Sequence, residues 1–139
     1  MRDFERYGPA IALFHFGCLA MALSFGIVVI KGGSPVTPEL YGPRVYAIPA
    51  LVWASVQVGG STLGGLGAVM GGKLGAAICL MGSSIAALMY CTLAALALEA
   101  THGTLVAAGS MFLTAPLSVV SAVVSGRFLL RGAAWATKT

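Results

Sequence analysis

His15 is the residue whose type and position most strongly suggest chemistry. It is the only histidine or charged residue well inside any of the long uncharged stretches of the chain. Ionisable side chains within membrane segments often mark functional sites. A neutral imidazole can set the rotation of a helix by hydrogen bonding to Gln57 or to a serine. It can also serve as an axial haem ligand or contact a quinone, so both interpretations of His15 stay open.

The depth of the polar residues predicts which of them meet. At a rise of about 1.5 Å per residue, His15 lies roughly 9 Å into its stretch and Gln57 about 18 Å into the next, which runs the other way. In a hydrocarbon core about 30 Å thick, these depths are similar. Ser83 or Ser84 in the third stretch and Ser118 in the fourth reach the same level. We therefore expect a polar layer that contains His15, Gln57, Ser84 and Ser118.

The spacing of Glu99 and His102 also resembles a metal-binding pattern, because di-iron helices carry ligands three residues apart. A metal needs further carboxylates or imidazoles, however, and Glu39 is the only one expected on the same side. We predict no metal site.

Nucleophilic catalysis has little support in the sequence. The chain contains no GxSxG motif, and Cys18, which lies three residues from His15, has no acidic partner to orient an imidazole. Cys18, Cys79 and Cys91 all lie in apolar runs without CxxC spacing, which is typical of small buried residues. We expect no enzymatic activity, no catalytic residue and no cofactor other than bound lipid.

The composition shows what must surround these residues. Of the 139 residues 58% are hydrophobic and 9% are charged, against roughly 25% charged in an average soluble domain. So few charged residues cannot cover so much apolar surface in water, so we expect a lipid bilayer to do so. The basic residues are scattered and form no stripe, which argues against nucleic acid as a partner.

Four stretches without formal charge are each long enough to cross a bilayer as a helix. We predict an all-α membrane protein, a single domain over 1–139 that forms an antiparallel bundle of four transmembrane helices. The expected spans are approximately 9–30, 45–70, 74–98 and 104–126, with a main loop at 31–44 that is dense in glycine and proline.

The basic residues predict the orientation. Six lie on the side of the termini, namely Arg2, Arg6, Lys73, Arg127, Arg131 and Lys138, and two lie on the other side, Lys31 and Arg44. By the positive-inside rule, both termini face the cytoplasmic side. We expect an integral protein of a bacterial-type inner membrane or another energy-transducing membrane.

Small residues recur at every fourth position on the second and third stretches, which aligns them along helix faces that can pack closely in lipid. The two sets on and after the second stretch are Gly60, Gly64, Ala68 and Gly72, and Gly67, Gly71 and Gly75, and the third stretch carries Cys79, Ser83 and Ala87. These GxxxG-like faces can join the second and third helices, or bind a partner subunit or another copy of the chain. A broken, re-entrant segment at 59–72 is a further alternative.

Pro116 lies in the middle of the fourth stretch, where it removes a backbone N–H and predicts a kink. Ser110, Thr114 or Ser118 can satisfy the carbonyl that the kink leaves without a partner.

These patterns favour a small non-catalytic membrane subunit or scaffold, which packs into a larger assembly or homo-oligomer through its small-residue faces. Two alternatives remain. One is an oligomeric pore or holin-like protein, although none of the stretches carries the polar stripe that a water-filled pore needs. The other is an accessory subunit of a redox complex, with His15 near haem or quinone.

Overall fold

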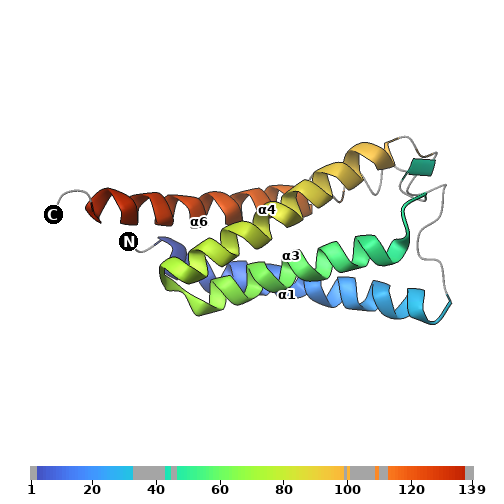
Figure 1. The fold of residues 1–139 in the computed structure, drawn as a ribbon, viewed down its shortest axis with the longest axis horizontal. Helices are drawn as coiled ribbons and strands as arrows, with labels where there is room; N and C mark the ends of the chain where they lie inside the picture. Colours follow the sequence, from blue (N-terminus) through green and yellow to red (C-terminus); the bar gives the residue numbers. More distant parts are fainter. Residues whose placement is uncertain are drawn as a thin grey trace.

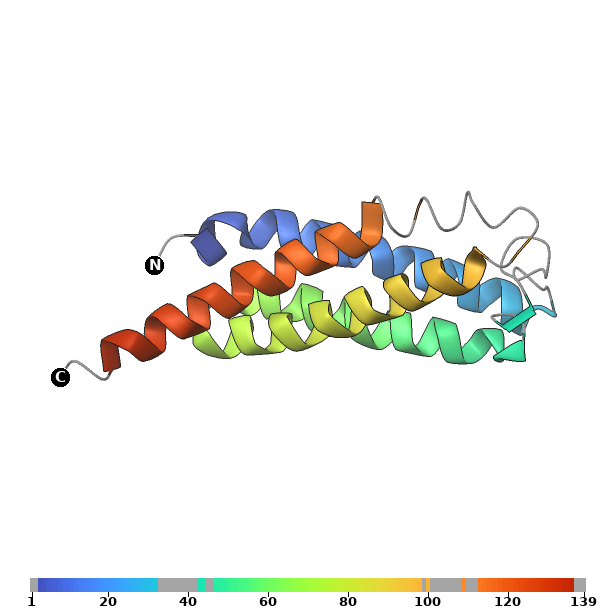
Figure 2. The same ribbon diagram turned by 90° about the horizontal axis from the view of Figure 1, so that it is seen from above.

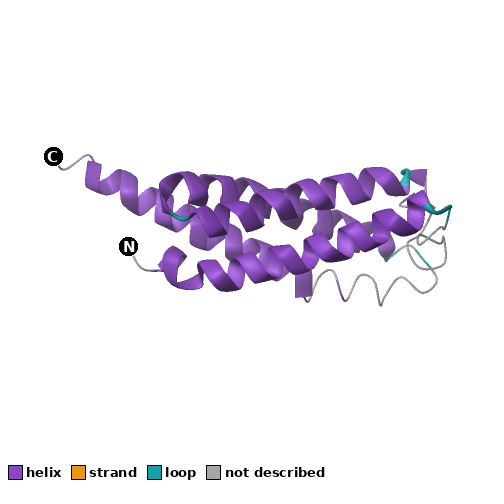
Figure 3. Cartoon of the chain, turned by 90° about the horizontal axis from the view of Figure 1, so that it is seen from below, coloured by secondary structure: helices purple, strands orange, loops and turns teal. Residues whose placement is uncertain are grey.

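The computed structural model describes residues 3–32, 43–44, 47–98, 100, 109 and 113–136, and this part of the chain is helical apart from short turns (Figure 3). Its four helices are α1 (Asp3–Ile30), α3 (Ala50–Met70), α4 (Gly72–Ala97) and α6 (Ala115–Ala136) (Figure 1). The all-α prediction is confirmed for these residues. By length and composition, α1 and α4 are able to span a membrane, a test that the core helix of a soluble protein or a signal sequence also passes.

The first three helices follow the predicted stretches, with differences at their ends. Helix α1 begins six residues earlier than expected, so Pro9 lies inside the helix. Its ring leaves the Glu5 carbonyl without an intrahelical N–H partner, and Glu5 and Pro9 are both exposed at this end. Helix α3 starts five residues later than expected, directly after Pro49. Most of the predicted loop, 33–42, lies outside the described residues.

The fourth helix differs most from the prediction. Pro116 is the second residue of α6, and Leu113 and Thr114 directly before it form a π-helical turn. Residues 110–112, over which the predicted kink would extend, lie outside the described residues. At its other end, α6 continues beyond 126 through Arg127 and Arg131 to Ala136. Arginine is a good helix former, so a charge that ends an apolar run does not end the helix. Of the predicted residues 104–112, the structure describes only Gly109.

Successive helices run in opposite directions (Figure 1). Helix α3 packs against both α1 and α4, α4 also packs against α6, and α1 touches α6 more sparingly. As a result, the start of α1, the turn between α3 and α4, and the last residues of α6 gather at one end of the molecule, as both views show (Figure 2).

A glycine pair makes the turn between α3 and α4. Gly71 and Gly72 have φ angles of 64° and 61°, in the left-handed region that side chains with a Cβ rarely adopt. The Gly71 N–H donates to the Gly67 carbonyl at 3.3 Å, and the Gly75 N–H to the Gly71 carbonyl at 3.0 Å. These two members of the predicted faces therefore form the reversal rather than a packing ridge.

Beyond this turn, the backbones of α3 and α4 touch. A Cβ atom on Gly67 would collide with the backbone nitrogen of Cys79, and one on Gly82 with the nitrogen of Gly64. On Gly75 it would lie 2.5 Å from the Gly67 carbonyl oxygen. Only hydrogen atoms at these positions allow so close an approach, which maximises van der Waals contact between the helices.

The interior consists of small side chains. Alanine accounts for most of the buried apolar residues of the described part of the chain, and Cys18 and Cys79 are buried with them. The leucine and valine side chains of this part are half-buried or exposed. Larger groups close one end of the bundle, where the rings of Phe4 and Phe128 lie 5.4 Å apart. Helices with small inward side chains can pack closely along their length.

The contact between the backbones of α3 and α4 predicts that one added methyl group lowers the stability of the bundle. We expect Gly67→Ala to lower the free energy of unfolding by about 1–3 kcal/mol, because the added carbon overpacks a contact with backbone atoms that cannot rotate away. The measurement is helix content by circular dichroism during titration of the detergent-solubilised protein with sodium dodecyl sulfate.

Gly26→Ala on α1 is the matched control. Gly26 also lies inside a helix and has no atom within 4 Å of its Cβ position, so the change should be neutral or stabilising by up to about 1 kcal/mol through helix propensity. Equal effects of the two substitutions would contradict the close approach.

Candidate functional site

The buried polar side chains gather in two clusters beside α1. The His15 cluster comprises His15, Cys79, Ser83 and Ser121, from α1, α4 and α6. The Gln57 cluster comprises Cys18, Gln57 and Tyr90, from α1, α3 and α4. Because His15 and Cys18 are three residues apart, the two clusters stack one helical turn apart on the same face of α1.

The His15 cluster ties three helices together. Nε2 of His15 lies 3.0 Å from the Ser83 hydroxyl and 3.3 Å from that of Ser121, and the two hydroxyls lie 2.8 Å apart. The Cys79 sulfur lies 3.8 Å from Ser83 Oγ and 3.7 Å from Ser121 Oγ. His15, Cys79 and Ser83 are completely buried, and Ser121 is 2% exposed. The cluster is a closed hydrogen-bonded junction.

Helix α3 makes room for the imidazole. A Cβ atom on Gly64 would lie 2.5 Å from Nδ1 of His15, so only glycine can face the ring at this position. The ring of Phe14 meets the imidazole edge-on at a centroid distance of 5.1 Å. Between the glycine backbone and the two hydroxyls, His15 has little freedom to rotate.

One of the two ring nitrogens of His15 has no hydrogen-bond partner among the described residues. Among the described residues, Nδ1 of His15 has no hydrogen-bond partner, and neither has the buried hydroxyl of Ser61. A buried N–H without a partner is rarer than a buried acceptor without one. We therefore assign the proton of the neutral ring to Nε2, which donates to Ser83 or Ser121, and the unpaired lone pair to Nδ1.

This arrangement supports a structural role for the imidazole more directly than a catalytic or cofactor role. Both ring nitrogens are enclosed, Nε2 by the two serines and Nδ1 by the backbone of α3. Ligation of a haem iron would require the ring to leave this position. The described residues also contain no group of three or more histidine, cysteine or acidic side chains suited to a metal ion.

The Gln57 cluster joins α3 to both neighbouring helices. The Gln57 side-chain amide donates to the Tyr90 hydroxyl at 2.9 Å and, at 3.4 Å, to the backbone carbonyl of Cys18. The side chains of Cys18 and Tyr90 belong to the same buried cluster. Both are 5% exposed. Polar groups at this level are therefore paired across helices, as lipid surroundings would demand.

The predicted polar layer is thus divided between two levels. Gln57 bonds to Tyr90 rather than to His15, and Ser83 rather than its neighbour Ser84 faces the imidazole. Ser118 is buried, but its hydroxyl donates to the Thr114 carbonyl at 2.8 Å. Rotation of the helices, which depth alone does not specify, separates these residues.

Ser121 and Tyr90 are the site residues that the sequence analysis missed. Ser118, Ser121 and Ser125 are spaced three and four residues apart and are all buried. That spacing places them on one face of α6, and it is the sequence signal that could have identified Ser121. Tyr90 had no comparable signal, because its contacts with Gln57 and Cys18 join three different helices.

Most of the predicted small-residue faces lie in the interior. The buried members are Gly60, Gly64, Gly67, Ala68, Gly75, Cys79 and Ser83, while Ala87 and Gly71 are half-buried and Gly72 is exposed. Cys91 is exposed as well, unlike the other two cysteines. Glu39, Glu99 and His102 lie outside the described residues.

Comparison with protein family models, with curated proteins and with solved structures found no match to this chain.

Two serine substitutions test the pairing. We expect Ser83→Ala to lower the free energy of unfolding by about 0.5–2 kcal/mol, because it removes the closer partner of the His15 imidazole. Ser61→Ala removes a buried hydroxyl that has no partner, so it should leave the stability unchanged or raise it. Denaturation by sodium dodecyl sulfate, followed by circular dichroism, compares the two. A Ser61→Ala variant as unstable as Ser83→Ala would show that the Ser61 hydroxyl is bonded.

Proposed function

We propose that this chain is a non-catalytic membrane subunit or scaffold, which crosses the bilayer with α1, α3, α4 and α6 and associates with other subunits or with copies of itself. The observation that carries this proposal is the distribution of its side chains. Small and polar residues are buried, among them His15 and Ser83, while Leu13, Leu88 and Leu130 are more than two-thirds exposed. Water disfavours such a surface, whereas lipid suits it.

The low burial of the apolar helices supports a lipid surrounding. The core helix of a soluble protein is mostly buried, but only 17% of the apolar window in α1 is buried and 44% of that in α4. Helix α3, which carries five glycines and Gln57, is not one of the two helices that pass the length and composition test. Helix α6 contains Arg127 and Arg131, which are exposed and whose long side chains can extend to the interface.

The heights of the basic residues support the proposed orientation. Arg6 lies nine residues before His15, Lys73 ten before Ser83 and Arg131 ten after Ser121. The hydrogen bonds of His15 align the three helices, so these cations lie at a common height, about 14–15 Å from the His15 cluster.

The distance between the basic residues at the two ends of α1 agrees with the thickness of a bilayer. Lys31 follows Arg6 by 25 residues, or about 38 Å of helix, which is close to the roughly 40–45 Å of a membrane with its headgroup layers. By the positive-inside rule, the end with Arg6, Lys73 and Arg131 faces the cytoplasm, together with both termini, as in a bacterial-type inner membrane.

The contact with other subunits requires small residues that still face outward. Because the glycines at 60, 64 and 67 are used inside the bundle, we assign this role to Gly17 on α1 and Gly59 on α3, where no atom lies within 4 Å of a Cβ position. The exposed Ser24 and Ser55 hydroxyls donate to carbonyls of their own helices, at 2.9 and 2.7 Å. Because these hydroxyls are already hydrogen-bonded within their own helices, they add little polarity to the outer faces. Their small side chains still let a neighbouring helix approach.

Membrane topology is the first test. We expect the chain to stay in the membrane fraction after alkaline extraction, and reporter domains fused to either end to be active only in the cytoplasm. A fusion after Lys31 should report the opposite side. Recovery of the chain in the soluble fraction, or termini on opposite sides, would contradict the proposal.

Association is the second test. After extraction in a mild detergent, the tagged chain should purify with other subunits or as an oligomer. Gly17→Leu should reduce this association at least tenfold, because the side chain blocks helix approach. Gly26→Leu is the control, since nine residues place Gly26 on the opposite face of α1 and its Cβ position is also open. Purification of monomer alone would refute the scaffold function.

A further inference from the structure

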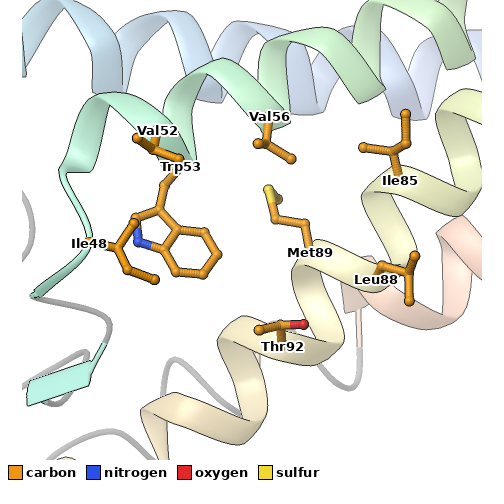
Figure 4. Close-up of a pocket in the computed structure, with 8 residues that line it drawn as sticks. All are labelled: Ile48, Val52, Trp53, Val56, Ile85, Leu88, Met89 and Thr92. Carbon is orange, nitrogen blue, oxygen red and sulfur yellow. The ribbon is translucent and has the colours of Figure 1, made fainter.

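An apolar groove opens between the first half of α3 and the last half of α4. It has a volume of about 300 Å³. Figure 4 shows its lining, which consists of Ile48, Val52, Trp53, Val56, Ile85, Leu88, Met89 and Thr92. Along α4 the lining runs from Ile85 to Thr92, which are seven residues apart, or about 10 Å.

The groove results from a change in side-chain size along the two helices. Near their turn, Gly67 and Gly82 bring the backbones into contact. Farther along, Trp53 and Met89 occupy the interface instead, and the two helices diverge (Figure 1). Met89 is 7% exposed and forms the floor, where it belongs to the same apolar cluster as Trp53.

The rim of the groove is apolar and open. Val52, Val56 and Leu88 are 49%, 40% and 70% exposed, so the groove opens toward the medium that contacts the outward leucines and valines of the bundle. In the lining, the Thr92 hydroxyl and the Trp53 indole nitrogen are the only side-chain polar groups. Such a surface binds hydrocarbon through area and shape rather than through hydrogen bonds.

The chemistry of the groove favours a hydrocarbon chain as its occupant. Such a chain is narrower than a helix with its side chains, which is about 10–12 Å wide. It also has no polar groups to satisfy, which suits a lining that is apolar apart from the Thr92 hydroxyl and the Trp53 indole nitrogen.

Cationic residues lie at the end of the bundle toward which α3 and α4 diverge (Figure 1). Lys31 directly follows α1, and Arg44 lies six residues before the first residue of α3, and both are exposed. This is the end at which α1 finishes and α3 begins (Figure 1). A lipid phosphate at this level would meet positive charge while its chain ran into the groove.

We propose that this groove binds one acyl chain of a phospholipid, whose phosphate lies near Lys31 and Arg44. The inference rests on the proposed membrane location and adds a specific lipid site to it. A lipid held there would fill the space between the diverging helices, and would become part of the surface that the bundle presents to its neighbours.

Native mass spectrometry tests the site. The full chain is purified from vesicles of phosphatidylethanolamine and phosphatidylglycerol in a mild detergent, and we expect one phospholipid to remain bound. Val56→Phe fills the groove and should reduce the lipid-bound fraction at least tenfold. Val69→Phe is the matched control, because Val69 is an exposed valine of the same helix outside the groove, and it should retain the lipid.

Fluorescence provides an independent readout. In a Trp135→Phe background, Trp53 is the remaining tryptophan, and phosphatidylglycerol with brominated acyl chains should quench it even after dilution into lipid-free detergent. Val56→Phe should abolish this persistent quenching, whereas Val69→Phe should preserve it. Three results would overturn the proposed site and leave the membrane function intact. They are a membrane-inserted chain without bound phospholipid, equal lipid binding by the two variants, and a dimer that excludes lipid from the groove. A chain that fails to enter the membrane would overturn both.

Discussion

The contact between the backbones of α3 and α4 is the constraint on which the rest of the structure depends. Gly67 and Gly82 allow two helices to approach where any side chain would collide with a neighbouring backbone. This approach brings Gly64 and Ser83 to the same level, where one accommodates the His15 ring and the other hydrogen bonds to it. The histidine junction and the tight hairpin are therefore parts of one packing arrangement.

The same contact explains why the other half of the hairpin is open. Rigid helices that touch at one end separate at the other when their side chains become larger. Trp53 and Met89 lie where the helices separate, and the resulting space is apolar because almost all of the side chains that line it are apolar. A closed polar junction and an open apolar groove thus follow from one gradient of side-chain size.

The interior of the bundle differs in composition from the core of a typical soluble protein. In water, helices gain most of their stability by burying leucine and valine. Here alanine, glycine, serine and cysteine are buried, so stability must come from close packing and from hydrogen bonds such as those of His15 and Gln57. The enclosed polar groups join the helices to one another.

From the sequence alone, the helical class, the approximate extent of the first three helices and the importance of small residues on α3 could be predicted. Charge, hydropathy and four-residue spacing are local properties, and local properties are sufficient for these features. The partners of His15 and the separation of Gln57 from it could not be predicted in this way. They depend on how each helix is rotated about its axis and on where two helices touch. The tertiary structure decides both, because they result from packing of all the helices at once.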